Sequence, residues 1–211
     1  MGTFAPTGSL PSSERNAVAL LLPSDLVLIV GGIDSSSRLT SLVEYDPSAG
    51  TFSNVGSKDA PYDTAPLLND GNVLLAGGGN FVSPGSGNDV LTTAELYNPA
   101  TGSLIDTGPA LQGVIAPAVV RLVDGRVLLT GGKLYNQGGA PTAAVEIYDP
   151  SSGTFSFTSS MTTPRYNHSA TLLEDGDVLI AGGSSSSLTG VPLATAELYD
   201  PLEQRSLPSP K

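Results

Sequence analysis

The sequence predicts an all-β repeat protein, because four copies of one strand-forming pattern follow one another along its 211 residues. Each copy has an apolar run that ends in a Gly-Gly doublet, then a variable loop, and then a segment related to Glu-x-Tyr-Asp-Pro. The doublets begin at Gly31, Gly77, Gly131 and Gly182, and the tyrosines are Tyr45, Tyr97, Tyr148 and Tyr199. A period of roughly fifty residues indicates supersecondary units, each too small to bury its apolar face without a neighbour.

The fourth unit shows the predicted strands most clearly. Residues 168–173 form a short apolar run, an Asp-Gly turn follows, and residues 178–181 form a second run before the Gly doublet. Two such runs joined by Asp-Gly predict a β-hairpin, because glycine accepts the positive φ that this turn requires. Residues 195–199 predict a third strand that ends at Asp-Pro, and residues 154–157 of the third unit show the fourth strand. Each unit is therefore expected to contain four short antiparallel strands.

These units resemble kelch repeats. The resemblance rests on the Gly doublet after the second strand, on Glu-x-Tyr-Asp-Pro in the third strand and on Gly-Thr-aromatic in the fourth, and it covers essentially the whole chain. It implies a β-propeller in which each unit is one blade. The family usually has tryptophan in the fourth strand, at a core position where this chain has Phe4, Phe52, Leu104 and Phe155.

We expect residues 1–211 to form a single four-bladed propeller domain, with blades at about 16–56, 62–108, 114–160 and 166–201. Residues 2–10 align position by position with residues 153–161. They are expected to supply the fourth strand of the last blade and so to close the ring as a monomer, which removes exposed sheet edges. Two alternatives stay open: a segment of a longer propeller in which residues 205–210 begin another blade, and a dimer of half-rings.

Composition excludes several classes of function. The formal net charge is −11 with only nine Lys and Arg residues, and such a surface repels nucleic-acid phosphates. No apolar stretch approaches the roughly 18 residues needed to span a bilayer. The chain has no cysteine, which excludes disulfides, thiolate nucleophiles and Cys-ligated metals. The first residues lack the charged and apolar regions of a signal peptide, and the compartment is left open.

Residues that recur once per unit are expected to build the scaffold. Glutamates in third strands can accept backbone N–H groups from an adjacent turn, and aspartates before proline can close Asx-turns. These residues are Glu95, Glu146, Glu197, Asp46, Asp149 and Asp200. The recurrent tyrosines should be buried, with their hydroxyls hydrogen-bonded. In the first unit Glu44 directly precedes Tyr45, so its side chain should point to the opposite face of its sheet.

His168 is the single histidine, and it lies in an Arg-x-x-His-Ser segment that resembles the kelch first-strand opening. Aligning the units places Ala17, Asp63 and Pro117 at the same position, around one mouth of a central channel. Asp63 with His168 could trap an ion there, but one histidine and one carboxylate are a thin ligand set. We therefore predict no metal site, no cofactor and no catalytic residue.

Ligand contacts are expected from residues unique to one unit, on the face that carries the second-to-third strand loops and the connections between blades. The candidate binding residues are Arg15, Tyr62, Asp63, Phe81, Tyr135, Arg165, Tyr166 and His168. The leading hypothesis is a non-catalytic kelch-like module that binds a protein, peptide or glycan. One alternative is a small propeller enzyme, a lyase or isomerase, with a polar pocket at the channel mouth. Another is a minimal or engineered scaffold without a selected ligand. Some kelch-like propellers are enzymes, including a copper oxidase with a cysteine-linked tyrosine, and the lack of cysteine excludes that chemistry.

Overall fold

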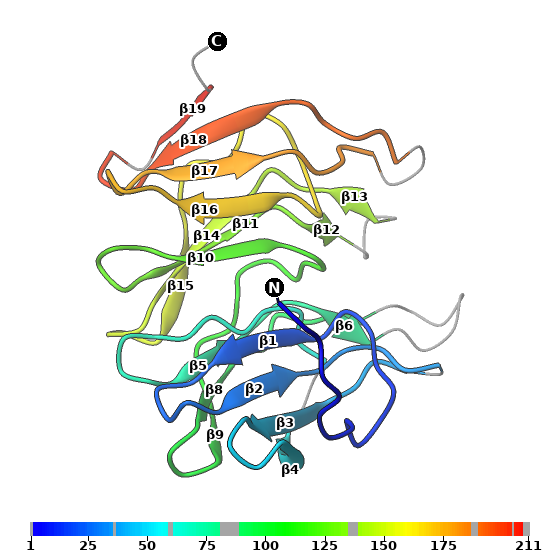
Figure 1. Cartoon of the computed structure of the whole chain (residues 1–211). Helices are drawn as coiled ribbons and strands as arrows, with labels where there is room; N and C mark the ends of the chain where they lie inside the picture. Colours follow the sequence, from blue (N-terminus) through cyan, green and yellow to red (C-terminus); the bar gives the residue numbers. More distant parts are fainter. Residues whose placement is uncertain are drawn as a thin grey trace.

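The structure, a computed structural model, describes residues 2–35, 37–58, 61–80, 89–134, 139–186, 190–203 and 205–208. Every regular element in these ranges is a β-strand (Figure 1). None of them contains a helix that is long and apolar enough to cross a membrane. The prediction of an all-β fold is confirmed.

Four antiparallel sheets follow one another along the chain, one for each sequence unit. The first consists of β1 (Val18–Leu21), β2 (Val27–Val30), β3 (Ser41–Asp46) and β4 (Thr51–Ser57), and the second of β5 (Val73–Leu75), β8 (Glu95–Asn98) and β9 (Ser103–Asp106). The third consists of β10 (Ala118–Arg121), β11 (Val127–Thr130), β14 (Val145–Asp149) and β15 (Thr154–Phe157). The fourth consists of β16 (Ser169–Leu172), β17 (Val178–Ala181), β18 (Ala196–Asp200) and β19 (Arg205–Pro208). Two short hairpins, β6 (Gly79–Asn80) with β7 (Asp89–Val90) and β12 (Lys133–Leu134) with β13 (Ala140–Pro141), lie in second-to-third strand loops.

The predicted hairpins form at the Asp-Gly turns. Gly125 has a φ of 91° and Gly176 a φ of 95°, the left-handed region that glycine enters without steric cost. In the first unit, where Pro23-Ser24-Asp25 replaces Asp-Gly, Asp25 itself takes a φ of 65°. The turns therefore set the register of the strand pairs that follow them.

The second sheet departs from the predicted four strands per unit. Its first strand is reduced to two isolated bridges, Thr64 with Ala76 and Leu67 with Val73. Pro66 lies between them and has no N–H to donate, although its carbonyl still accepts from Leu74 at 3.0 Å. Proline thus interrupts the ladder at this one position.

Apolar side chains from neighbouring sheets meet face to face in three clusters, one at each junction. Because successive residues of a strand point to opposite faces, one strand serves two junctions. In β5, Val73 and Leu75 pack toward the first sheet, whereas Leu74 packs toward the third. All three are fully buried. Each sheet therefore depends on its neighbours to cover both of its faces.

The recurrent tyrosines connect consecutive units through their hydroxyl groups. Three of them contact a threonine of the preceding segment, in the pairs Thr7–Tyr45 at 2.8 Å, Thr107–Tyr148 at 2.9 Å and Thr158–Tyr199 at 2.8 Å. Tyr97 instead donates to Glu44 Oε1 at 3.4 Å, which confirms that Glu44 faces away from the other units' glutamates. Tyr97, Tyr148 and Tyr199 are at most 1% exposed, as predicted, whereas Tyr45 is half-buried.

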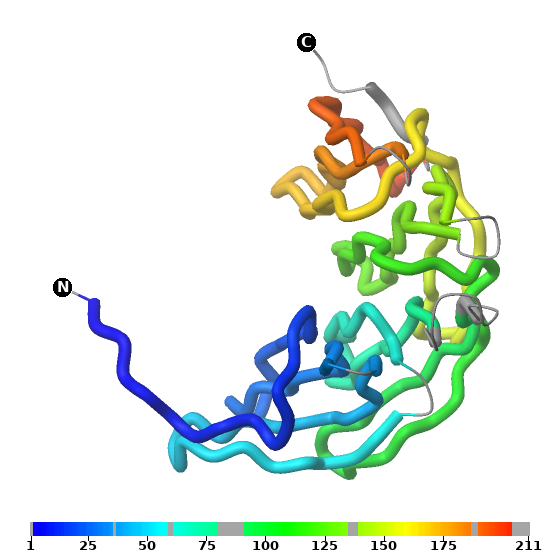
Figure 2. The backbone as a smooth tube through the Cα atoms, turned by 90° about the vertical axis from the view of Figure 1, so that its right-hand side faces the viewer, coloured from blue at the N-terminus to red at the C-terminus, as the bar shows by residue number. Residues whose placement is uncertain are grey.

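The predicted closed ring of four blades, with residues 2–10 completing the last blade, is wrong. In the part of the chain that the structure describes, the sheets form an open arc, and no sheet joins the first unit to the fourth (Figure 2). The outer strand of the fourth sheet is β19, which pairs with β18 in the register Tyr199 with Ser206. Pairing with an adjacent segment costs less loop-closure entropy than pairing with residues roughly two hundred positions away. β19 thus completes the fourth sheet, and it does not begin another unit.

Residues 2–10 lie beside the first sheet instead. The Gly8 N–H donates to the Gly50 carbonyl at 2.9 Å, next to the Thr7–Tyr45 contact. The same two contacts, one between glycine backbones and one between a threonine and a tyrosine, occur between the second and third units, where the residues that follow β9 meet the third sheet. The N-terminal segment therefore takes, against the first sheet, the position that the end of a fourth strand takes against the next sheet.

The aromatic residue of the fourth strand fills the predicted core position in the third unit. Phe155 is 7% exposed and its ring centroid lies 4.8 Å from that of Tyr148. The ring centroid of Phe52 lies 4.6 Å from that of Tyr45, but Phe52 is only half-buried, and Leu104 packs partly buried against the first core cluster. Phe4 is fully exposed, so its assignment to the core is wrong. Its segment pairs with no third strand among the described residues.

Replacing Tyr148 separates packing from hydrogen bonding at a sheet junction. We expect Tyr148→Ala to lower the free energy of unfolding by about 3–5 kcal/mol, as for other buried aromatics. Tyr148→Phe should cost about 1 kcal/mol, the net value of its hydrogen bond to Thr107. Urea denaturation measures both. Tyr45→Ala is the control and should cost clearly less, because Tyr45 is only half-buried; equal losses at the two positions would contradict this account.

Candidate functional site

A polar pocket of about 330 Å³ lies where the connections between units meet the loop between β2 and β3. All four units contribute to it. The lining residues used below are Asn16, Ile33, Arg38, Tyr62, Asp63, Ala116 and Asn167. The predicted convergence of connections and loops on one face is therefore confirmed for this part of the molecule.

The pocket wall contains an equivalent backbone turn from three of the units. Asn16, Ala116 and Asn167 precede the first strands of the first, third and fourth sheets, with φ values of 59°, 53° and 52°. Asparagine tolerates this left-handed conformation, whereas alanine is held there at a cost of roughly 1–2 kcal/mol. Tyr62 occupies the matching place in the second unit. The same position in each of the four units thus lines one pocket, with asparagine, tyrosine, alanine and asparagine in turn.

An ion pair between Arg38 and Asp63 forms the charged part of the pocket. The Arg38 Nη1 group donates to Asp63 Oδ1, and the other carboxylate oxygen accepts the Ala116 N–H at 3.1 Å. The two side chains are only 15% and 17% exposed. Arg38 was not among the predicted site residues, although it is the one basic residue of the loop between β2 and β3. Its loop carries no motif, so only the folded loop brings it to Asp63.

Two of the predicted binding residues, Tyr62 and Asp63, line the pocket. Arg15 is exposed beside a separate shallow pocket of about 220 Å³. Tyr166 is buried under Lys133, whose Nζ lies 3.8 Å from the ring centroid.

Phe81 and Tyr135 lie outside the described residues. His168 donates to or accepts from the Thr130 hydroxyl at 2.8 Å through Nε2, and it is not among the residues that line the pocket with Asp63.

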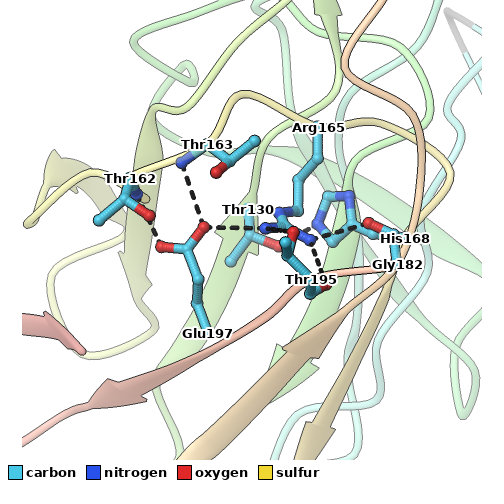
Figure 3. A network of polar contacts seen from close by, with 8 residues as sticks. All are labelled: Thr130, Thr162, Thr163, Arg165, His168, Gly182, Thr195 and Glu197. Carbon is cyan, nitrogen blue, oxygen red and sulfur yellow. Dashed lines mark hydrogen bonds and ion pairs between the residues drawn. The ribbon is translucent and has the colours of Figure 1, made fainter. Parts of the chain in front are cut away.

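Arg165 belongs to a buried network that holds the fourth sheet to the connection before it (Figure 3). Its guanidinium is fully buried and donates to Glu197 Oε1 at 2.9 Å and to the carbonyls of Gly182 and Thr195 at 2.8 and 3.1 Å. Glu197 also accepts the N–H groups of Thr162 and Thr163, at 2.7 and 3.1 Å. The structure thus gives Arg165 and Glu197 a structural role between the fourth sheet and the connection before it.

The third unit contains the same carboxylate without the arginine. Glu146 accepts the N–H groups of Leu111 and Gln112, both at 2.8 Å, so the predicted role of the strand glutamates is confirmed here as for Glu197. Val114 takes the place of Arg165, and burial raises the pKa of Glu146 above its usual range. The contact of the glutamate with two backbone N–H groups therefore occurs in both the third and the fourth unit, whereas the arginine is specific to the fourth.

We expect Arg165→Val, which copies the third unit, to lower the free energy of unfolding at pH 7 by about 3–5 kcal/mol, because it leaves Glu197 buried without its cation. The control is Arg126→Val, which removes an exposed ion pair with Asp124 and should cost less than about 1 kcal/mol. Urea denaturation of both variants tests the difference. Similar small losses would show that the buried pair adds nothing beyond the backbone contacts of Glu197.

A buried lysine, Lys58, lies beside Tyr62, and the half-buried Glu14 interacts with it electrostatically; neither is among the predicted site residues. Lys58 is 2% exposed, and its Nζ lies 5.8 Å from the Tyr62 ring centroid without a hydrogen-bond partner among the described residues. Burial lowers the pKa of Lys58 to about 8, partly offset by the carboxylates of Asp63, Glu95 and Glu14, while Arg38 lowers it further. Burial also raises the pKa of Glu14, against the effect of Lys58.

The burial of Lys58 predicts a pH-dependent stability. Between pH 8 and 10.5 the unfolded chain holds the proton that the folded protein has released, so the parent gains stability with rising pH. At pH 7 we therefore expect Lys58→Met to be more stable than the parent, by up to roughly 3 kcal/mol, and the difference to shrink toward pH 10.5. Unfolding free energies at pH 7 and pH 10 measure this. A difference between Lys58→Met and the parent that stays constant from pH 7 to pH 10 would refute the argument.

The comparisons with known proteins identify a fold and not a family. No protein-family model and no curated protein matches the sequence. Among solved structures, the chain is similar to a novel fungal alcohol oxidase with catalytic diversity among the AA5 family, in complex with copper. The TM-score is 0.72 over 95% of this chain, at 18% sequence identity, and the chain spans 44% of the length of that oxidase. The arrangement of the all-β units is therefore shared with part of that oxidase.

The described residues do not fit a copper site. No three of the His, Cys, Asp or Glu residues in the described ranges are grouped so that they could hold a metal ion. The Nε2 atom of His168 is bonded to Thr130, and Nδ1 is buried without a partner. Burial, with a further contribution from Arg165, lowers the pKa of His168 to about 4 and keeps the imidazole neutral at physiological pH. A single neutral imidazole with one side already bonded is not a copper ligand set.

Proposed function

We propose that the four sheets are kelch-like blades of a non-catalytic binding module, and that the pocket between Asn16, Arg38, Asp63 and Asn167 binds a neutral glycan. The observation that carries this proposal is the set of polar groups that line one pocket from different units. Asn16 and Asn167 are exposed and offer both amide donors and carbonyl acceptors. Arg38 and Asp63 offer further donors and acceptors in a fixed pair.

The shape and charge of the site favour a sugar over other ligands. A volume of about 330 Å³ lies at the lower end of the range for small-molecule sites. Ile33 and Leu39 provide apolar surface beside the polar groups, as a sugar ring with its C–H faces requires. The net charge of −11 disfavours anionic ligands.

The enzymatic alternative has less support from the same geometry. A general acid or base must reach its substrate with a free proton-accepting or proton-donating atom. Both oxygens of Asp63 are engaged by Arg38 and Ala116, and the Nε2 atom of His168 is engaged by Thr130. These atoms of Asp63 and His168 therefore already serve contacts within the protein, which favours the binding role.

A glycan-array screen followed by calorimetric titration tests the proposal. Asn16→Gly and Asn167→Gly remove the amides and keep the left-handed backbone that both positions need. We expect each to weaken binding at least tenfold, a loss of about 1.4 kcal/mol, without a change in melting temperature. The sugar should be recovered unchanged by mass spectrometry.

Asp25→Gly is the matched control, because Asp25 is also left-handed and does not line the pocket. It should bind the sugar as the parent does. Full affinity in both asparagine variants, or no glycan bound by the parent, would refute the site.

A further inference from the structure

Two equivalent grooves lie beside the Asp-Gly turns, away from the pocket. Each is formed by the hairpin turns of two neighbouring units together with the Asp-Pro turn of the later unit. The second–third groove, of about 470 Å³, lies between the second and third sheets, and the third–fourth groove, of about 290 Å³, between the third and fourth. Because the repeats align, the contents of the two grooves can be compared position by position.

The second–third groove contains an arginine, Arg126, and an asparagine, Asn69, whose side chain occupies part of the groove. Arg126 Nε donates to Asp124 Oδ2 at 2.7 Å within this groove. The Asn69 amide lies over Gly125, with its nitrogen 2.5 Å from where a Cβ atom on that glycine would be. The guanidinium also lowers the pKa of Asp149, after the larger effects of its hydrogen bonds with Ser151. Carboxylates in this groove are therefore partly neutralised from within the chain.

The third–fourth groove has lost all three of these polar residues. Val123 replaces Asn69, Asp177 replaces Arg126 and Leu202 replaces Ser151. Val123 is 75% exposed and Leu202 is 95% exposed, and the nearest atom to a Cβ on Gly176 would be a Val123 methyl at 3.9 Å. The result is an open and largely apolar groove.

Carboxylates surround this apolar groove without a basic residue among its lining residues. Asp175 accepts one backbone N–H group and Asp200 accepts two, in each case through one carboxylate oxygen. Burial and the like charges of Asp175 and Asp200 raise the pKa of Asp177. Asp124, which lines both grooves, is paired with Arg126. Among the side chains that the structure describes, no basic residue forms an ion pair with Asp177, which stands where the equivalent groove holds a guanidinium.

We propose that the third–fourth groove docks a peptide segment in which an arginine adjoins a leucine-like side chain. The guanidinium takes the place that Arg126 takes in the second–third groove, where a planar fork of donors matches the carboxylates. The apolar neighbour covers Val123 and Leu202, and removes their exposed surface from water. The overall charge of −11 assists the approach of a basic segment.

A fluorescein-labelled peptide with two Leu-Arg repeats, titrated by anisotropy at low and at physiological salt, tests the proposal. We expect saturable binding that weakens at least tenfold when citrulline replaces arginine, since citrulline keeps the shape and removes the charge. In the protein, Asp177→Arg copies the second–third groove and should weaken binding at least tenfold. Its melting temperature should be no lower than that of the parent, because a like charge is removed. Leu202→Ser should weaken binding several-fold through the loss of apolar contact.

Asp106→Arg is the matched control. It changes the net charge by the same amount at an exposed carboxylate on β9, outside the groove, and should keep the affinity of the parent. Equal losses in Asp106→Arg and Asp177→Arg would show attraction to the whole surface and overturn the proposal. So would equal binding of the citrulline peptide, or no binding by the parent. Concentration-dependent self-association that Leu202→Ser abolishes would assign the groove to a second copy of the chain and overturn it as well.

Discussion

The burial of a third-strand tyrosine between consecutive sheets, which Tyr97, Tyr148 and Tyr199 share, is the interaction on which the arrangement of the sheets depends. A short four-stranded sheet has two apolar faces and cannot cover both by itself. The tyrosine ring supplies buried surface at the junction, and its hydroxyl fixes how far and in which register the two units approach. The hydroxyls of Tyr148 and Tyr199 each contact a threonine of the preceding segment, and the glutamate two residues earlier adds two backbone N–H bonds from the same connection. Ring, hydroxyl and carboxylate together position one sheet on the next.

The local part of this structure could be read from the sequence because its causes are local. Asp-Gly turns at Gly125 and Gly176 require a left-handed residue, and short apolar strands flank them. The buried tyrosines and the strand glutamates followed from their recurrence. The offset of Glu44 was predicted correctly because side-chain direction along a strand depends only on counting residues.

The parts that could not be predicted depend on distance or on competition between segments. Closure of the ring was inferred from the likeness of residues 2–10 to residues 153–161, but β19 pairs with β18 and takes that place. Pro66 weakens a strand whose apolar pattern is otherwise intact. Arg38 reaches Asp63 only through the course of a loop without a motif. A sequence period gives the structure of one unit and its contact with the next, but not the curvature that three such contacts produce.

The junction between the first and second sheets is the one at which Tyr97 meets Glu44 at 3.4 Å and no threonine takes part. The same junction buries the Lys58 ammonium without a hydrogen-bond partner among the described residues, and its second sheet has lost most of its first strand. Arg38 of the first unit and Asp63 of the second lie on opposite sides of this junction. Their ion pair therefore supplies here a polar cross-link between consecutive units, which the later junctions obtain from a tyrosine and a threonine.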